Sequence, residues 1–322
     1  MTMTLDVGTA ALIDPASEPV HLRSGVLRSG ESTWREPEDR QIRIDGSTHL
    51  APLADAVAGE FCRANPGAGV RVRRCGTRAG FESFADGQAH AVLASRPIRA
   101  SEARRAIERG LGFIELPVAF DSFSVFVYRE NEWAGSITMP ELQAAWRAIR
   151  PARTWRDLRP EWPDRPLRLR SPGLGPDLLK TFLRMVDGDR PADWTAAGPE
   201  TGNGEDEEGG GPDILGVASY AQAARGIDPF RTIPVDGGDG PVAPGRESVS
   251  DGRYPLLARP LFLYVFSSPE QVPGLQDFVR FFLRRAIPLA EALGFIPLSD
   301  RVRDVLWERF ERRHLGAFLG LV

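Results

Sequence analysis

Apolar and polar residues follow two different periods in the first third of the chain. Residues 42–44 alternate as in a half-buried strand, and apolar residues recur at helical spacing between 53 and 61. A second strand is predicted at 70–72, a short helix opens at Phe81, and residues 91–94 have the continuous apolar character of a buried strand. Strands, glycine or hydroxyl turns and helices in this order are typical of βαβ units. We therefore expect a parallel α/β sheet in this region.

Two longer apolar strands are predicted at 123–127 and 261–266, on either side of a region rich in Trp, Pro and Arg. This arrangement predicts a discontinuous first lobe, 41–122 and 262–322, and an inserted second lobe, 123–261. The same patterns predict further helices at 101–110, 139–148, 176–186, 274–293 and 299–313, and further strands at 113–116 and 213–217.

Two polar segments are predicted to lie outside this framework. Residues 1–40 are aperiodic and predict a flexible N-terminal arm, and residues 198–213 predict a flexible acidic loop. We interpret the acidic run at 205–208 as part of that solvated loop rather than as metal ligands. The four histidines are scattered without metal-binding spacing, so we predict no metal site and no cofactor.

Composition excludes several classes of function. The 322 residues, 42% of them hydrophobic, suffice for a buried core. Forty Lys and Arg against 44 Asp and Glu give a net charge of −4, so no overall basic field favours nucleic acid or an anionic membrane. No run approaches the roughly 18 apolar residues of a membrane span. Serine-hydrolase, Walker, zinc and dinucleotide motifs are absent from the sequence, so we do not expect an enzyme.

The compartment is left open by the sequence. The first residues lack the basic segment and the long apolar run of a signal peptide, which fits either a cytoplasmic protein or an exported one whose true start lies upstream. Cys62 and Cys75 are the two cysteines. Two isolated thiols are the simpler interpretation, whereas a disulfide between them would favour export.

Several motifs recur in order along most of the chain: IRIDGSTHLAPLADAVAGEF, GTRAGFESFADGQAHAVLASRPI, YPLLARPLFLYVF and LAEALGFIPL. In them the chain resembles the phosphate-binding proteins of phosphate ABC transporters, in register from about residue 41 to 310. These are type II periplasmic binding proteins. The resemblance implies a bilobal α/β fold, with two mixed-sheet lobes joined by hinge strands, that closes on an oxyanion without chemistry.

The resemblance also implies three anion-binding loops in the first lobe. The family holds phosphate with backbone N–H groups at helix N-termini, with hydroxyls and with an arginine. In the first loop, Thr48 would offer its hydroxyl and His49 its amide. Thr77 would be the hydroxyl donor of the second loop. Ser95 and Arg96 match the third loop.

The second-lobe loop departs from the family pattern. Ser171 opens it, but residues 176–178 read Pro-Asp-Leu where the family carries Ser-Gly-Thr. Proline lacks an N–H group, leucine lacks a hydroxyl, and the carboxylate of Asp177 would repel an anion at a helix N-terminus. We therefore expect Asp177 to oppose tight phosphate binding.

The first lobe departs from the pattern in the opposite sense. Arg78 replaces a small residue of the second loop, and His90 stands where the family usually carries an aspartate. Together with His49 these are candidate cations. A ligand that carries both charges is therefore an alternative to phosphate.

Most of these residues also have a structural interpretation. Thr48 and Thr77 are suited to cap helices, and Arg96 is suited to pair with a carboxylate. His90 fits a satisfied, half-buried histidine, and Asp177 is favourable in the first turn of any helix. Three tryptophans are interpreted as lobe packing rather than as a sugar platform: Trp146, Trp155 and Trp162.

We interpret the chain as a non-catalytic solute-binding protein of an ABC transporter that holds a phosphate-type oxyanion between two lobes and delivers it to a permease. The resemblance implies a periplasmic or extracellular monomer with no membrane span and no nucleic-acid partner. The alternative is a degenerate domain that acts as an intracellular sensor or interaction module and no longer binds phosphate. The missing signal peptide and the altered second-lobe loop motivate that alternative.

Overall fold

The chain folds as two compact units. In the computed structural model, unit 1 runs to Phe120 and resumes at Arg259, and unit 2 is the intervening segment, Asp121–Ala258. The predicted arm at 1–40 and most of the predicted acidic loop lie outside the described residues. The structure describes residues 41–147, 151–174, 176–187, 211–224, 229–250, 252–254 and 256–317.

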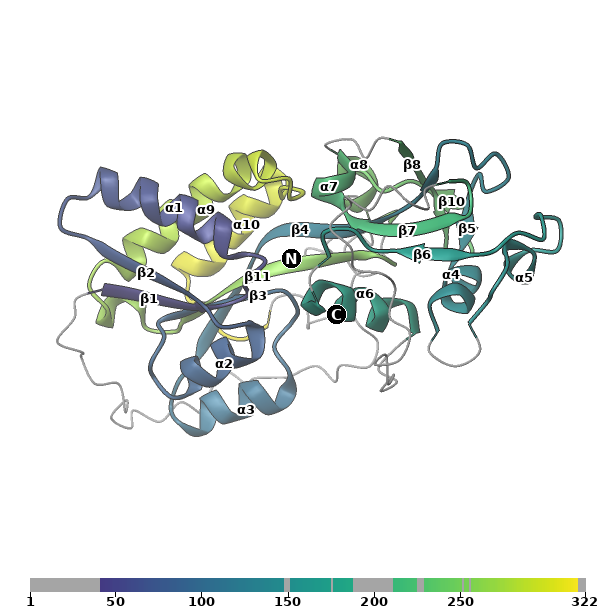
Figure 1. The fold of residues 1–322 in the computed structure, drawn as a ribbon. Helices are drawn as coiled ribbons and strands as arrows, with labels where there is room; N and C mark the ends of the chain where they lie inside the picture. The colour runs from purple at the N-terminus through teal and green to yellow at the C-terminus, as the bar shows by residue number, and fades with distance from the viewer. Residues whose placement is uncertain are drawn as a thin grey trace, which may run out of the picture. The chain divides into compact units, whose positions relative to one another are not determined.

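Three parallel strands form the centre of unit 1 (Figure 1). Strand β1 lies between β2 and β3, with Ile44 opposite Val72 on one side and Ala91 on the other. Strand β11 pairs antiparallel with β3 and places Leu263 opposite Leu93. The sheet is therefore mixed, and its parallel part is the predicted βαβ region. The bounds are Gln41–Gly46 for β1, Gly69–Arg74 for β2, Ala91–Ala94 for β3 and Ala258–Phe266 for β11.

Helices cover both faces of this sheet (Figure 1). Helices α1, α9 and α10 lie on one face, and α2 and α3 lie on the other. Helix α1 buries Leu53, Val57 and Phe61, the positions that predicted it, because these residues share one face at helical spacing. The bounds are Ala51–Ala64 for α1, Thr77–Ala85 for α2, Ala100–Glu108 for α3, Leu275–Ala292 for α9 and Asp300–Glu311 for α10; a short 3₁₀ turn, η2, spans Pro269–Gln271.

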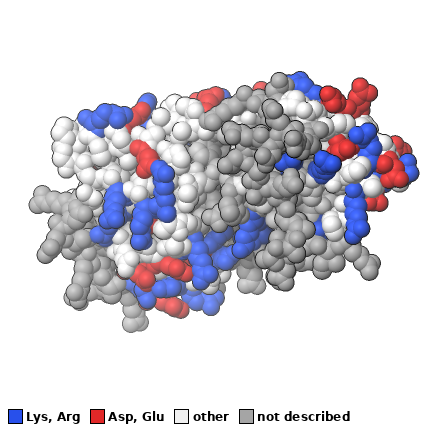
Figure 2. All heavy atoms as spheres, viewed as in Figure 1, with Lys and Arg blue, Asp and Glu red and all other residues white. Residues whose placement is uncertain are grey.

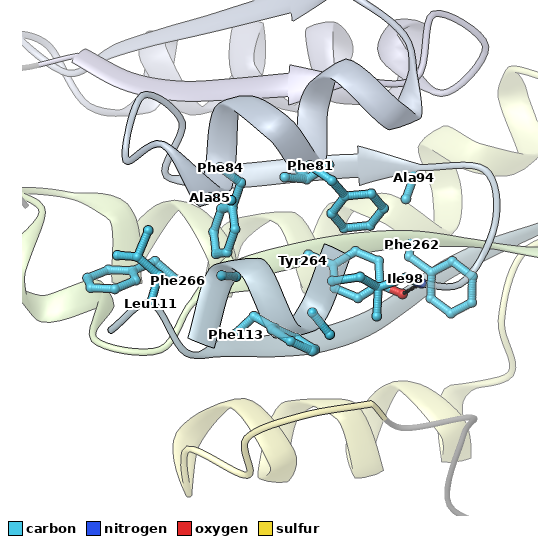
Figure 3. Packing of buried hydrophobic residues seen from close by; sticks show 13 residues of the cluster. Phe81, Phe84, Ala85, Ala94, Ile98, Leu111, Phe113, Phe262, Tyr264 and Phe266 are labelled. Carbon is cyan, nitrogen blue, oxygen red and sulfur yellow. Dashed lines mark hydrogen bonds between the residues drawn. The ribbon is translucent and has the colours of Figure 1, made fainter. Parts of the chain in front are cut away.

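An aromatic cluster fills the space between the sheet of unit 1 and helices α2 and α3 (Figure 3). Tyr264 lies at its centre, with its ring centroid 4.9 Å from that of Phe81 and 5.7 Å from that of Phe113, both in edge-to-face geometry. Such pairs contribute roughly 0.5–1.5 kcal/mol each beyond their buried area. The cluster therefore fixes helix α2 against β11.

Unit 2 is built around strands β4, β6, β7 and β8. Strand β7 pairs antiparallel with β4 and parallel with β6, and β8 pairs antiparallel with β4. Strands β5, β9 and β10 form a separate small sheet. The strands are β4 Phe113–Tyr128, β5 Ile137–Thr138, β6 Arg168–Arg170, β7 Ile214–Ser219, β8 Phe230–Ile233, β9 Val235–Asp236 and β10 Pro241–Val242. The helices are α4 Met139–Trp146, α5 Trp155–Leu158, α6 Pro176–Asp187, α7 Tyr220–Ala224 and α8 Arg246–Ser250.

The three tryptophans selected from the sequence are packing residues of unit 2, as predicted. Trp146 and Trp155 are fully buried and Trp162 nearly so. Trp146 meets Phe182 of α6 edge-to-face, and the guanidinium of Arg159 lies 4.3 Å from the ring centroid of Trp162. With these rings occupied inside the unit, they offer no platform for a sugar.

Strand β4 is longer than predicted, and the two cysteines are not paired with each other. The strands predicted at 113–116 and 123–127 are parts of one strand, β4, because Asp121 and Ser122, which resemble a polar break, are buried within it. Cys62 and Cys75 are both free and half-buried, in agreement with the interpretation as isolated thiols.

Candidate functional site

Three loops meet at the carboxyl ends of the parallel strands of unit 1. They follow β1, β2 and β3, which all point the same way, so the loops share one edge of the sheet. Backbone hydrogen bonds tie the first two loops to the ends of neighbouring strands. The Ser47 N–H donates to the Leu93 carbonyl at 2.8 Å, and the Gly76 N–H donates to the Gly46 carbonyl at 2.9 Å. We call these three segments, residues 47–50, 75–77 and 95–98, the loop edge of unit 1.

Thr77 and Ser95 are brought together at this edge. Thr77 Oγ1 accepts the backbone N–H of Ser95 at 3.2 Å, and the two hydroxyl oxygens are also 3.2 Å apart. Thr77 is the first residue of α2, whose N-cap is Gly76 and whose N-terminus has no side-chain cap. The capping interpretation of Thr77 is therefore wrong. Two hydroxyls and the first N–H groups of a helix lie together, which is a suitable arrangement for an anion.

The first loop is organised by a residue that the sequence analysis did not select. Ser47 is buried, and its Oγ accepts the Leu50 N–H at 3.4 Å, ahead of α1. Thr48 beside it is exposed, and its side chain caps no helix, since the N-cap of α1 is Leu50. His49 is half-buried, edge-on to Phe295 at 5.2 Å between ring centroids. Ser47 directly precedes Thr48 in the turn after β1, so the hydroxyl pattern that selected Thr48 could also have selected Ser47.

Arg96 of the third segment forms a two-point ion pair with Glu102 of α3. Its two terminal nitrogens lie 2.8 and 2.7 Å from the carboxylate oxygens of Glu102, and one of them also donates to the Pro97 carbonyl at 3.0 Å. The guanidinium stands 5.6 Å from the ring centroid of Phe81. The interpretation that Arg96 pairs with a carboxylate is confirmed. Glu102, three residues after Arg99 at the start of α3, holds the guanidinium in one orientation.

The other candidate cations do not join the Thr77–Ser95 pair. The side chain of Arg78 is 81% exposed and bonds Glu82 at 3.0 Å, an exposed pair of the kind that contributes little to stability. His90 is buried, and its Nδ1 accepts the Arg43 N–H at 2.9 Å. Burial, with a smaller effect from the charge of Arg43, lowers the pKa of His90 to about 4. His90 is therefore neutral at pH 7, and the expectation that it adds a positive charge is wrong.

Two glycines allow α2 to approach the end of β1. Gly46 has a φ of +136°, and a Cβ atom there would lie 2.1 Å from the Leu93 carbonyl oxygen. A Cβ atom on Gly80, in the first turns of α2, would lie 2.7 Å from the Gly46 Cα. Next to them, the buried Asp45 accepts hydrogen bonds from Arg73 and Ser83 and fastens β1 to β2 and α2. This close packing fixes Thr77 relative to the first loop.

One predicted residue of unit 2, Ser171, has a buried hydroxyl. Ser171 follows β6 and is fully buried, and its Oγ has no hydrogen-bond partner among the described residues. The turn continues through Gly173, which has a φ of +64° and packs against the end of the Gln222 side chain, 1.8 Å from where a Cβ atom would lie. Gln222 in turn accepts hydrogen bonds from the N–H and hydroxyl of Ser219, at the end of the neighbouring strand β7. The side chain of Asp177 lies outside the described residues.

The described part of the chain carries both signs of charge but no candidate metal centre. Acidic and basic side chains both appear on the face shown in Figure 2. The ion pairs of the described residues include Arg73–Asp45 and Arg74–Asp55. Within the described ranges, no cluster of three His, Cys, Asp or Glu residues could hold a metal ion. No helix in this part of the chain has the length and hydropathy needed to cross a membrane.

The chain belongs to the PBP superfamily, whose domain model matches residues 32–286. It is 33% identical over 290 residues to the protein SphX of Synechocystis, covering 87% of this chain and 85% of SphX. It is 27% identical over 265 residues to the phosphate-binding protein PstS of Staphylococcus saprophyticus, with 81% of each covered. The predicted fold class and family resemblance are thereby confirmed.

A solved structure agrees with this assignment. The chain superimposes with a TM-score of 0.71 and 25% identity on a possible phosphate binding protein from Planctomyces limnophilus, covering 85% of this chain and 98% of the other. The mixed sheets and the βαβ order of unit 1 are therefore features of a known binding-protein fold.

Proposed function

We propose that the protein is a solute-binding protein of a phosphate ABC transporter and that it binds phosphate at the loop edge of unit 1 without chemical change. The observation that carries this proposal is the Thr77–Ser95 hydroxyl pair at the uncapped N-terminus of α2. Its relatives support the choice of ligand, because one of them is named as a phosphate-binding protein. Such a site selects an oxyanion by presenting several donors at once.

Each group at the loop edge would have a distinct role. The Thr77 and Ser95 hydroxyls would donate to phosphate oxygens, and the first N–H groups of α2 would add further donors. Thr48 and His49 would contribute a hydroxyl and an amide from the neighbouring segment. Arg96, held by Glu102, would supply a fixed positive charge.

The remaining parts of the proposal concern the whole protein. We propose that units 1 and 2 act as the two lobes of a binding protein, that the protein works outside the cytoplasmic membrane, and that it delivers its ligand to a permease as a monomer. Ser171 and Asp177 remain predicted contributors from unit 2. Cell fractionation tests the compartment, since recovery in the cytoplasm alone would contradict this part of the proposal.

Binding of radiolabelled phosphate at equilibrium tests the site. We expect saturable binding by the unmodified chain and a loss of about tenfold or more in Thr77→Val, which keeps the shape and removes the hydroxyl. Thr232→Val is the matched control, because Thr232 is an exposed strand residue of unit 2. Equal binding by Thr77→Val and the unmodified chain would refute the site.

A further inference from the structure

Tyr264 of β11 contacts two elements: helix α2, which begins at Thr77, and the loop that contains Ser95. Its ring packs edge-on against Phe81, one helical turn after Thr77 in α2. Its hydroxyl oxygen accepts the backbone N–H of Ile98, three residues after Ser95, at 2.8 Å. Figure 3 shows the Tyr264 ring next to Phe81 and Ile98. The buried Tyr264 side chain therefore contacts both the helix that carries the Thr77 hydroxyl and the loop that carries the Ser95 hydroxyl.

The Tyr264 hydroxyl makes a second hydrogen bond in the opposite direction. It donates to Glu115 Oε2 of β4 at 2.7 Å, and both side chains are almost completely buried. Burial, and next the charge of Glu115, raise the pKa of Tyr264 well above its usual value, so the hydroxyl keeps its proton. It can thus accept from Ile98 and donate to Glu115 at the same time.

The C-terminal part of the chain secures the far end of this network. The buried Arg309 of α10 donates from Nε to the Glu115 carbonyl at 3.2 Å and from a terminal nitrogen to the Gly316 carbonyl at 2.5 Å. The Gly316 N–H returns a hydrogen bond to the Phe113 carbonyl at 2.8 Å. A continuous series of contacts thus leads from α10 through Glu115 and Tyr264 to the loop that contains Ser95.

Such a network is a costly way to stabilise a core. Taking a carboxylate and a guanidinium out of water carries a large desolvation penalty, and apolar residues of similar volume are often equally stabilising or better. A hydroxyl that accepts one specific N–H, however, fixes the position of a loop in a way that apolar packing does not. The chemistry of the network therefore fits positioning better than bulk stability.

We propose that Tyr264, backed by Glu115 and Arg309, is a positioning residue that sets the separation of Thr77 and Ser95 and thereby the affinity of the site for phosphate. This inference rests on the proposed function of the same site. It extends the binding machinery to residues of β4, β11 and α10 that do not reach the loop edge themselves.

The test compares two tyrosine variants that each lose one buried hydroxyl. Tyr264→Phe keeps the aromatic packing and removes the hydrogen bonds to Ile98 and Glu115. Tyr254→Phe is the matched control, because Tyr254 is also buried and donates its hydroxyl to the Phe123 carbonyl in unit 2. Three quantities are measured on the full chain: the dissociation constant for inorganic phosphate, the exchange rate of the Ile98 and Ser95 amides, and the thermal midpoint.

We expect Tyr264→Phe to weaken phosphate binding by about 5- to 20-fold and to speed exchange of the Ile98 amide by about tenfold or more. Tyr254→Phe should lower the thermal midpoint about as much as Tyr264→Phe does, because each variant loses one buried hydroxyl. It should leave phosphate binding and Ile98 exchange unchanged. If both variants weaken phosphate binding equally, or neither does, Tyr264 is not a positioning residue for this site.

A conservative variant provides a second test. In Glu115→Gln an amide oxygen still accepts the Tyr264 hydroxyl, so we expect phosphate binding within about twofold of the unmodified chain and a protected Ile98 amide. Weakened phosphate binding with the Ile98 amide still protected would show that Glu115 affects the site by a route other than the position of this loop, and would overturn its part in the assignment.

The exchange measurement separates failure of this inference from failure of the proposed function. If the unmodified chain binds no phosphate, the proposed function fails. The positioning of Ser95 by Tyr264 would then be supported by faster exchange of the Ile98 and Ser95 amides in Tyr264→Phe alone. It would be refuted by unchanged exchange.

Discussion

Arg96 and Glu102 form a bidentate ion pair, with both terminal nitrogens of the guanidinium within 2.8 Å of the carboxylate. The Arg96 side chain is 25% exposed and that of Glu102 is 14% exposed, so the pair is partly shielded from water. Bidentate geometry restricts the rotation of the guanidinium. Arg96 is therefore held in a fixed orientation beside Ser95 before any ligand arrives.

Replacing Arg96 tests whether this fixed charge contacts the ligand. We expect Arg96→Ala to weaken phosphate binding by about 1.5–3 kcal/mol, or roughly 10- to 150-fold, because a charge-assisted hydrogen bond is lost. Calorimetric titration gives the affinity. Arg104→Ala on α3 removes the same charge from an exposed position and should leave binding nearly unchanged. A similar loss in both variants would mean that net charge, and not Arg96, is responsible.

The buried His90 predicts a pH-dependent stability. Its folded pKa of about 4 lies below the usual 6.5, so between these values the unfolded chain binds a proton that the folded chain does not. The free energy of unfolding should therefore fall as the pH is lowered from 7 toward 4, with about 2 kcal/mol from this group by pH 5.

Urea unfolding of His90→Asn at pH 7 and pH 5 measures that contribution. The asparagine side-chain oxygen can still accept the Arg43 N–H, but it does not titrate. We expect the loss of stability between the two pH values to be about 2 kcal/mol smaller than in the unmodified chain. The same loss in both proteins would contradict a low pKa for His90.

Alanine should have opposite effects on stability at Gly80 of α2, which packs against β1, and at Gly59 of α1, which does not. Gly80→Ala would place a Cβ atom 2.7 Å from the Gly46 Cα, so we expect destabilisation by about 1–3 kcal/mol. In α1, a Cβ atom on Gly59 meets only the end of the Arg63 side chain at 3.5 Å. Gly59→Ala should stabilise the protein by about 0.5–1 kcal/mol. Thermal unfolding with a fitted enthalpy measures both, and stabilisation by Gly80→Ala would refute the close packing.

Asp177 carries a prediction that comes from the sequence alone. A carboxylate in the first turn of α6 opposes the favourable end of the helix dipole for an anion. If it faces the ligand, Asp177→Asn should tighten phosphate binding by about tenfold or more, given the repulsion between like charges a few ångströms apart. Asp187→Asn, at the other end of α6, is the control. Equal affinities in both variants and the unmodified chain would remove Asp177 from the account.

The sequence predicted the elements whose apolar spacing is regular. Helix α1 and the strands β1 and β3 lie where their apolar residues placed them, because burial on one face requires that spacing. Strand β4 was divided in two because the pattern treats buried Asp121 and Ser122 as a break. Periodicity assigns polar residues to exposed positions, and it does not record that these two lie at buried positions of a strand, where the Ser122 Oγ has no hydrogen-bond partner among the described residues.

The candidate site could be predicted less completely. Thr77 and Ser95 were selected by resemblance, and the structure brings them together. Glu102 and Tyr264 were missed, because their contacts with Arg96 and Ile98 depend on tertiary packing. Tyr264 is 166 residues from Ile98 in the sequence. A lone tyrosine in an apolar strand carries no signal of such a role.

The most direct test of the central claim is a calorimetric titration of the full, unmodified chain with phosphate after dialysis into phosphate-free buffer. The account predicts saturable binding to one site per chain, weakened in Thr77→Val but not in Thr232→Val. The absence of saturable heat up to phosphate concentrations on the order of millimolar would contradict it.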